Sequence, residues 1–442
     1  MPATASSVMW FRRDLRLADN PALRAAVAEG PVMCLWVADP GILGRRHHRA
    51  PVRLRFLRAG LEALDADLRE RGSRLVVRHG DPEAVVPRVA AEVGATAVHW
   101  AREVSPLGRD RDARVAAALQ AAGCRGVEHP GELLVEPDAI PGGSGRGVRV
   151  FTPFFRTWVG HRPAEHHAAP REIPGPRVDG VTPEDVLPAG TPLLQAGEAA
   201  ARRAVVRFIR NGGADAYDEG RNLLAQDGTS RLGPYLRFGM CTSAQVGRAL
   251  GLPGHLSRGR AAFWRQLGWR EFMHHHMWWN PQVATGPFDP RFAGMPWDND
   301  PGMIAAWTEG RTGVPLVDAA MHQLHETGWM HNRTRMVVAS YLVKDLLVDW
   351  RIGERVFMQH LLDGDPANNN GGWQWTAGSG TDAAPFHRVF NPDRQAERFD
   401  PDGAYVARWL DGVDGRPETP IVDHALRRAE ALTRFRALSP RR

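Results

Sequence analysis

The chain has 442 residues, which at about 150 residues per domain predicts two or three domains. Hydrophobic residues make up 43% and charged residues 24%, as is typical of a soluble globular protein. The net charge of +6 permits nucleic-acid binding without requiring it. The three cysteines are isolated and form no CxxC pair, so neither a disulfide framework nor a zinc or iron–sulfur site is indicated.

No segment has the form of a secretory signal or a membrane span. The first 16 residues lack a charged start followed by a long apolar stretch. The most apolar late segment, Met336–Val348, is interrupted by Lys344 and Asp345 and is too short to cross a bilayer. We therefore expect a reduced, cytoplasmic protein with no membrane partner.

Short apolar runs alternate with helical patterns through residues 1–130. The runs 8–11, 32–37, 75–77 and 97–100 have the length and composition of buried strands. This alternation predicts an α/β domain with a Rossmann-like parallel sheet, whose ligands bind in the crevice at the carboxyl ends of the strands.

The pattern changes twice further along the chain. Residues 131–197 are rich in Pro, Gly and His, which predicts a long connector over the surface. From 198 to 442 helical periodicity prevails, and this part is expected to be an all-α domain. Its helices are expected over 204–209, 263–279, 315–325, 333–347 and 354–362.

Segment Asp227–Leu236 places hydroxyl residues, glycines and Arg231 just before a helical run. Backbone N–H groups at a helix start, aided by hydroxyls and an Arg, suit a phosphate. An ordinary N-cap is the alternative.

Segment Trp264–Phe272 places Gln266, Trp269 and Arg270 on one helix face. An amide, an indole and a guanidinium together could hold a base and its phosphate. The alternative is an aromatic core stripe capped by a salt bridge.

Segment Gly328–Met336 places Asn332, Arg335 and Met336 on a shared face. An Asn and an Arg on an otherwise apolar helix are costly to bury without a ligand or a partner. A ligand site and a paired structural role both remain open here.

Segment Asp363–Trp375 crowds two acids, three amides and two indoles into a region that reads as turn-rich. A calcium loop is the first alternative, but Ala367 stands at a ligand position and no terminal Glu follows. A solvated turn would have little use for Trp373 and Trp375, so a functional site is favoured.

These four segments, with Trp10–Asn20 and Phe151–Phe155, resemble the DNA photolyases and cryptochromes. The resemblance runs in order from Val8 to Trp409 and is strongest to the class I cyclobutane pyrimidine dimer photolyases. It implies an α/β antenna-binding domain, a helical FAD-binding domain, and light-driven electron transfer from reduced FAD to a dimer flipped out of DNA. A monomer is expected.

The resemblance also implies roles for single residues. FAD would be held by Tyr217, Thr229, Ser230, Arg231, Leu232, Arg270, Trp329, Asn332, Arg335, Asp363, Asp365 and Asn369. Asn369 would face the flavin N5 atom, and Trp373, Trp350 and Trp297 would relay electrons to the flavin. The dimer and its flanking phosphates would be contacted by Gln266, Trp269, Met336, Trp375, Arg388 and Arg394.

Two positions depart from the family pattern. Gln266 stands where many cyclobutane-dimer enzymes carry Glu, and an amide cannot carry a proton or a negative charge. Gly233 stands where the family often has Ser. Within the family, (6-4) photolyases carry two histidines where this chain has Asn332 and Met336. Cryptochrome photoreceptors usually replace the residue at Asn369 and have long C-terminal tails.

A second chromophore is expected in the α/β domain. Folate-binding relatives have an Asn-Glu pair where this chain has Ser105-Pro106, which favours 8-hydroxy-5-deazaflavin over methenyltetrahydrofolate. Asp39, Arg53 and Glu103 would be its contacts, and an empty crevice is the alternative. No metal site is expected, because the consecutive histidines 274–276 splay around a helix.

Overall fold

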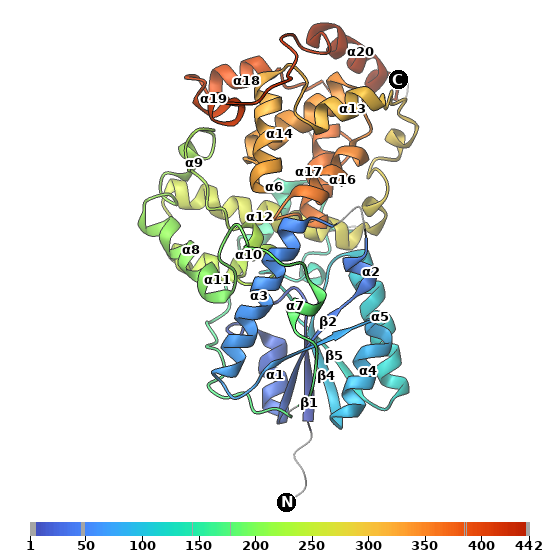
Figure 1. Cartoon of the computed structure of the whole chain (residues 1–442), viewed down its shortest axis with the longest axis vertical. Helices are drawn as coiled ribbons and strands as arrows, with labels where there is room; N and C mark the ends of the chain where they lie inside the picture. The colour runs from blue at the N-terminus through green and yellow to red at the C-terminus, as the bar shows by residue number, and fades with distance from the viewer. Residues whose placement is uncertain are drawn as a thin grey trace, which may run out of the picture.

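The computed structural model describes residues 6–45, 49–143, 145–176, 178–383, 385 and 387–438. In these ranges an α/β domain lies at one end of the molecule and a helical domain at the other (Figure 1). The sheet of the described chain is parallel throughout, with strand order β3-β2-β1-β4-β5. Its strands are β1 (Ser6–Phe11), β2 (Val32–Ala38), β3 (Leu75–His79), β4 (Ala95–Ala101) and β5 (Arg125–His129).

Helices cover both faces of this sheet because successive side chains of a strand point to opposite faces. Met9 and Phe11 of β1 pack in the cluster that includes α1 and α3, and Val8 and Trp10 pack with α4 and α5. The covering helices are α1 (Pro21–Glu29), α3 (Pro51–Arg69), α4 (Pro82–Glu92) and α5 (Pro106–Ala121), with the short α2 (Pro40–Leu43) after β2.

The fold class predicted from the sequence is confirmed, with one strand added. Strand β5 is an edge strand with the sequence RGVEH, and its residues are exposed or half-buried. It has no apolar run, so hydrophobic patterning did not reveal it.

The connector is more anchored than its composition suggests. It contains η2 (Pro137–Ala139), α6 (Phe151–Trp158) and α7 (Pro183–Val186). Phe151, Phe154 and Trp158 of α6 are buried in the core cluster shared with the long helix α12. Further on, Val181 forms an antiparallel bridge with Val77 at the edge strand β3.

Helices make up the described part of the chain beyond Gly197. They are α8 (Glu198–Arg210), α9 (Tyr217–Gly220), α10 (Gly233–Arg237), α11 (Ser243–Leu250), α12 (Arg258–Trp279), η3 (Pro281–Ala284), η4 (Pro290–Gly294), α13 (Pro301–Thr308), α14 (Pro315–Thr327), α15 (Asn332–Ser340), η5 (Tyr341–Asp345), α16 (Trp350–His360), α17 (Pro366–Ala377), α18 (Pro392–Phe399), α19 (Ala404–Leu410) and α20 (His424–Ala437).

Two expectations about this half were wrong in detail. The helix expected over 333–347 ends at Ser340 and continues as a π turn, η5. The segment read as turn-rich is a helix, α17, which begins after the N-cap Asp365. Gly371 of this helix serves packing: a Cβ there would lie 2.4 Å from Met273 Sδ, so the missing side chain lets α17 approach α12 closely.

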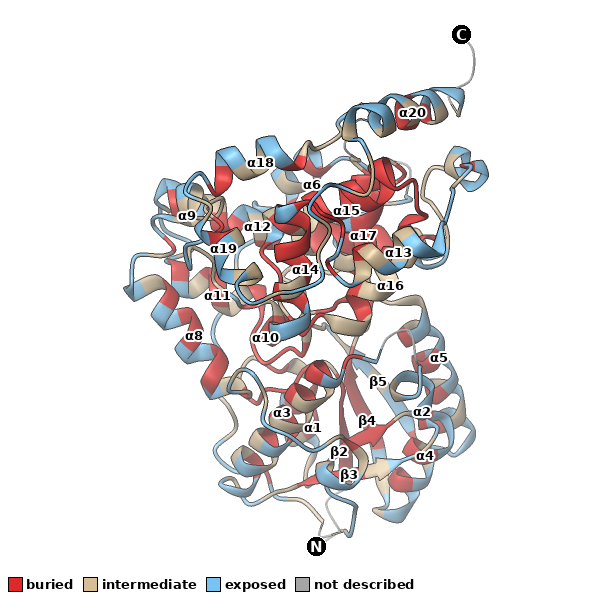
Figure 2. Ribbon diagram, turned by 45° about the horizontal axis from the view of Figure 1, so that its top comes forward, coloured by how far each residue is buried: buried red, intermediate tan, exposed pale blue. Residues whose placement is uncertain are grey.

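Buried residues concentrate in strands β1 to β4 and in helices α14, α15 and α17, whereas few residues of α18 and α20 are buried (Figure 2). None of the described helices is both long and apolar enough to cross a membrane.

Candidate functional site

A cavity of about 660 Å³ lies between α12, α15, α17 and the segment 229–233. Its volume is in the range of small-molecule and cofactor sites. The predicted site residues that line it are Tyr217, Thr229, Ser230, Arg231, Leu232, Gln266, Trp269, Arg270, Trp329, Asn332, Arg335, Met336, Asp363, Asp365, Asn369, Trp373 and Trp375. The structure thus brings together residues that are up to 158 positions apart in the chain.

Segment 229–233 lines this cavity, and its backbone is strained at one residue and does not form a helix cap. Arg231 has a φ of +49°, a left-handed conformation that is uncommon outside glycine and clusters at functional sites. Its guanidinium carbon lies 4.4 Å from the centre of the Trp329 ring. The following helix α10 begins at Gly233 without a side-chain cap, so the N-cap alternative does not account for the hydroxyls.

Gly233 has a packing role here. A Cβ at this position would lie 2.7 Å from Asp363 Oδ2 and 2.9 Å from Asp363 Cβ. Asp363 cannot easily move aside, because both its carboxylate oxygens accept hydrogen bonds from Arg335 Nη2, at 3.1 and 3.0 Å. A glycine at position 233 therefore leaves the space that the Asp363 side chain occupies when it pairs with Arg335.

Several polar atoms around the cavity lack a protein partner. Among the described residues, buried side-chain nitrogens or oxygens without a hydrogen bond include those of Thr229, Arg237, Arg270 and Trp373, all of which line the cavity. A buried donor without a partner is costly, and native structures rarely leave one unsatisfied. These atoms therefore indicate a polar ligand, and their hydroxyl, guanidinium and indole donors suit a cofactor with phosphates and a heteroaromatic ring.

Helix α12 presents Gln266, Trp269 and Arg270 to the cavity on one face, as their spacing predicts. Trp269 stacks on Phe151 of the connector, with ring centres 3.8 Å apart and an interplanar angle of 8°. Arg270 forms an ion pair with Glu132 at 2.6 Å. The aromatic stripe and the salt bridge both exist, and they hold the same residues at the wall of the cavity.

Helix α17 carries the polar end of the site. Asp365 caps it by accepting a hydrogen bond from the Asn368 backbone N–H at 3.0 Å. The Asn369 amide donates to the Glu354 carbonyl at 3.0 Å and to the Glu354 carboxylate at 3.1 Å. Burial raises the pKa of Glu354, against the effect of this amide. A calcium loop is not compatible with this geometry, because the two acids bind guanidinium groups and a helix N-terminus.

The three tryptophans predicted as an electron relay differ in how far their side chains are exposed to solvent. Trp373 lines the cavity and is 2% exposed, Trp350 is 3% exposed, and Trp297 is half-buried against Phe435. Trp373 also contacts Trp307, with ring centres 6.0 Å apart. Sequence reasoning did not single out Trp307, since nothing in its local pattern distinguishes it from core.

Two of the predicted DNA contacts lie outside the main cavity. Arg388 lines an adjacent pocket of about 260 Å³, together with Arg333, Met336 and Arg398. Arg394 is an exposed residue in the first turn of α18.

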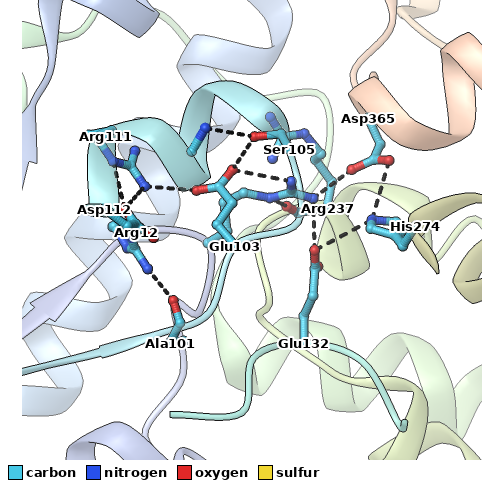
Figure 3. Close-up of polar contacts among 12 residues, drawn as sticks. Arg12, Ala101, Glu103, Ser105, Arg111, Asp112, Glu132, Arg237, His274 and Asp365 are labelled. Carbon is cyan, nitrogen blue, oxygen red and sulfur yellow. Dashed lines mark hydrogen bonds and ion pairs between the residues drawn. The ribbon is translucent and has the colours of Figure 1, made fainter. Parts of the chain in front are cut away.

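A buried cluster of charges joins the two domains beside the cavity (Figure 3). The Arg13 guanidinium, which follows β1, lies 2.5 Å from Asp365, 3.0 Å from Glu132 and 3.6 Å from Glu103. His274 Nε2 lies 3.5 Å from Glu132 and 3.4 Å from Asp365. Arg13 and Glu132 were not predicted from the sequence, because their partners are distant in the chain.

This cluster keeps its carboxylates ionised. Burial opposes the charge on Glu132, but Arg13 and Arg270 outweigh it and hold its pKa at about 2. Burial likewise opposes the charge on Asp365, yet His274 and Arg13 lower its pKa well below the usual value. Burial would also discharge His274, but the Asp365 carboxylate raises the pKa of the imidazole to about 9.

Glu132, His274 and Asp365 each offer a ligand atom within 4.8 Å of the others, which is the arrangement of a metal site. Arg13 already pairs with both carboxylates, and Arg270 pairs with Glu132. A metal ion would have to displace these cations and deprotonate His274. We assign the cluster to ion pairing between the domains.

The three predicted antenna contacts do not line the cavity, and each has protein partners. Asp39 caps α2 by accepting a hydrogen bond from Gly41 N–H at 2.7 Å. Arg53 is buried and donates to the carbonyls of Leu361 at 2.6 Å and Met358 at 2.8 Å, at the end of α16. Glu103 pairs with Arg111 at 2.9 Å. Their role as antenna contacts stays a prediction.

Two family models match this chain, one in the α/β half and one in the helical half. Residues 7–174 match the DNA photolyase family, and residues 263–437 match the FAD binding domain of DNA photolyase.

Relatives match over nearly their whole length. The chain is 41% identical to the deoxyribodipyrimidine photo-lyase of Synechococcus sp., covering 98% of this chain and 96% of that protein. It is 36% identical to the deoxyribodipyrimidine photo-lyase of Escherichia coli, covering 97% and 98%.

Solved structures agree with this likeness. A bacterial class III photolyase from Agrobacterium tumefaciens superposes with a TM-score of 0.89 at 35% identity, covering 98% of each chain. A cryptochrome from Synechocystis sp. superposes with a TM-score of 0.88 at 27% identity, covering 97% of this chain and 99% of that one.

Proposed function

The chain belongs to the DNA photolyase family, and from this membership we propose that it repairs cyclobutane pyrimidine dimers in DNA using light. The observation that carries the proposal is the cavity, in which buried donors without protein partners surround a space of cofactor size. FAD is the cofactor of this domain family, and when bound, reduced and excited by light it supplies the electron that opens the cyclobutane ring.

The residues around the cavity divide into two groups. Arg231, Arg270 and Arg335, with the polar atoms of Thr229 and Ser230, would hold the diphosphate and ring system of FAD. The other members of the predicted FAD set are Tyr217, Leu232, Trp329, Asn332, Asp363, Asp365 and Asn369. The fit is supported by the unpartnered nitrogen of Arg270 and the unpartnered hydroxyl of Thr229.

The second group would hold the flipped-out dimer against the cofactor. Trp269 and Trp375 offer aromatic surfaces, on which bases stack in a sequence-tolerant way. Gln266 can donate and accept hydrogen bonds with a thymine edge. Met336 lines both the cavity and the neighbouring pocket.

Positively charged residues beside the cavity would bind the phosphates that flank the lesion. Arg333, Arg388 and Arg398 line the adjacent pocket, and burial together with the charges of Arg221 and Arg398 lowers the pKa of Arg333. Arg394 is the fourth candidate for a phosphate contact. Phosphate contacts position DNA without reading its sequence, as repair at any dimer requires.

Electron supply to the flavin is proposed to run through Trp373, with Trp350 and Trp297 as the further members of the relay. The support is the position of Trp373, which is buried at the wall of the cavity and belongs to the same core cluster as the other two.

Two other functions within the family are weighed against repair of this lesion. A cryptochrome-type photoreceptor is favoured by the likeness to the Synechocystis protein, but Asn369 stands at the cavity wall where plant and animal cryptochromes usually differ. A (6-4) photolyase is disfavoured, because Asn332 and Met336 replace its two histidines. Relatives of class I and class III type both remain consistent with the repair function.

For the second chromophore we propose 8-hydroxy-5-deazaflavin, with methenyltetrahydrofolate or no antenna as alternatives. The support is Ser105-Pro106, which stands where folate-binding relatives have an Asn-Glu pair; Ser105 caps α5 by accepting a hydrogen bond from Gly108 N–H at 3.1 Å. A cytoplasmic monomer completes the proposal.

The decisive experiment is a repair assay. The reduced holoprotein is mixed with an oligonucleotide containing a thymine dimer and illuminated, and the restored thymine absorbance is measured. A dark sample and a sample with undamaged oligonucleotide are the controls. Repair of a (6-4) lesion instead, or flavin photochemistry with no repair, would replace the proposal with one of the alternatives.

A further inference from the structure

The only lysine of the chain, Lys344, is buried in the middle of the helical domain. It belongs to the π turn η5, which directly follows α15, the helix that begins with cavity residues. Such turns are rare and frequently occur at functional sites, because they redirect the side chains that follow. A buried ammonium without a strong partner is costly, so its position calls for an explanation.

Lys344 holds the segment His387–Asn391, which carries Arg388. Its Nζ donates a hydrogen bond to the Arg388 carbonyl oxygen at 2.6 Å. One residue before the π turn, Ser340 Oγ accepts a hydrogen bond from Phe390 N–H at 3.3 Å. Ser340 at the end of α15 and Lys344 in η5 thus bind the backbone of this segment on both sides of Val389.

The other face of the π turn belongs to a different contact. Asp345 forms an ion pair with His424 of α20, and its carbonyl accepts a hydrogen bond from Arg427 at 2.7 Å. The turn is therefore held against α20 by Asp345, and Lys344 adds a cation–π contact with α20, its Nζ lying 5.9 Å from the centre of the Phe435 ring. The hydrogen bond to the Arg388 carbonyl is made by Lys344, whereas the ion pair with His424 is made by Asp345.

The side chain of Arg388 is directed to the pocket of about 260 Å³ that it shares with Arg333 and Arg398. Arg333 donates to Asn222 at 2.6 Å, and burial together with the charges of Arg221 and Arg398 lowers the pKa of Arg333. Repulsion among such groups favours spreading apart unless the backbone holds them or an anion bridges them. Arg388 is exposed, so its backbone is what limits its position.

We propose that Lys344 is a positioning residue for DNA binding, which anchors the Arg388 backbone so that Arg388, Arg333 and Arg398 converge on one phosphate of the DNA strand. The inference rests on the proposed function and adds to it a buried residue that touches neither DNA nor cofactor. An ammonium suits this task better than a guanidinium, because it is a compact donor that can point at a single carbonyl.

The test begins with Lys344→Met, which keeps the unbranched apolar stem and removes the ammonium donor. The binding constant for a dimer-containing oligonucleotide is measured over a series of salt concentrations. We expect affinity to fall about tenfold and the salt dependence to weaken by about one phosphate contact. The visible spectrum of bound flavin should not change, because Lys344 does not line the cavity.

A double-variant cycle separates positioning from general destabilisation. If Lys344 acts through Arg388, then Lys344→Met should have little further effect on affinity or salt slope in an Arg388→Ala background. If Lys344→Met weakens binding equally in both backgrounds, the proposal is wrong. Ser340→Ala, which removes the second anchor, should weaken binding in the same direction.

The matched control is His424→Asn, which breaks the contact on the opposite face of the same turn. It should lower the unfolding temperature and leave the affinity for DNA unchanged. Equal losses of affinity in His424→Asn and Lys344→Met would mean that the turn matters only for stability. Failure of the unchanged protein to bind dimer-containing DNA would instead contradict the proposed function itself.

Discussion

The Arg13 guanidinium lies 2.5 Å from the carboxylate of Asp365, and this contact joins the end of strand β1 to the N-cap of the helix that carries Asn369 and Trp373. The α/β domain therefore reaches the wall of the cavity directly. Because Arg13 also pairs with Glu132, it holds two buried carboxylates at once.

Replacing Arg13 with Gln should destabilise the protein by about 3–5 kcal/mol, because it removes a cation that pairs with the two buried carboxylates of Glu132 and Asp365. Urea unfolding measures this loss, and the FAD content of the purified protein should fall with it. Arg69→Ala is the control, since its pair with Asp65 is exposed and should be worth less than about 1 kcal/mol. Equal effects of the two variants would contradict a special role for Arg13.

Stability should fall as the pH rises toward 9. Asp365 raises the pKa of His274 from 6.5 to about 9, so the protonated imidazole stabilises the folded state fully below pH 6.5. That stabilisation is lost as the pH rises through about 9. His424, beside Asp345, has a raised pKa as well and contributes with the same sign.

The measurement is the unfolding free energy between pH 6 and pH 9.5. This range spans the ordinary pKa of histidine, 6.5, and the raised pKa of His274 in the folded protein, about 9. His274→Gln should flatten the curve over this window and lower stability most at its acid end. A His274→Gln curve parallel to that of the unchanged protein would show that the imidazole is not charged in the fold.

Phe151→Leu should weaken binding of dimer-containing DNA about fivefold, or ~1 kcal/mol, the value of an aromatic pair beyond its buried area. Phe151 stacks on Trp269 and so fixes the ring proposed to meet the dimer. Affinity is measured by titration with a labelled oligonucleotide. Phe292→Leu, in an aromatic pair with Phe435 away from the cavity, should leave affinity unchanged.

Trp373→Phe should strongly slow the photoreduction of bound oxidised flavin, because the indole at the cavity wall is the first donor of the proposed relay. The rate is followed as the loss of oxidised-flavin absorbance under blue light with an external reductant. Trp100→Phe, a buried tryptophan of strand β4 in the other domain, is the control and should leave the rate unchanged. An unaffected rate in Trp373→Phe would assign the relay to other residues.

The sequence by itself determined the two kinds of domain and most of the cavity wall. Strands β1 to β4 are apolar enough to be recognised, and the face of α12 with Gln266, Trp269 and Arg270 follows from helical spacing. Local patterns carry this information because burial and periodicity act within a few turns of chain. The resemblance to a family then supplied roles that spacing alone could not.

Only the tertiary structure decided how the two domains share their charges. Arg13 finds its partner 352 positions later, and Arg53 reaches the end of α16 instead of an open crevice. The π turn that aims Lys344 at Arg388 also depends on packing against α20 and not on local propensity. Pairing between residues so far apart in the chain is a property of the packed fold, because each buried charge is satisfied only by the particular element that folding brings beside it.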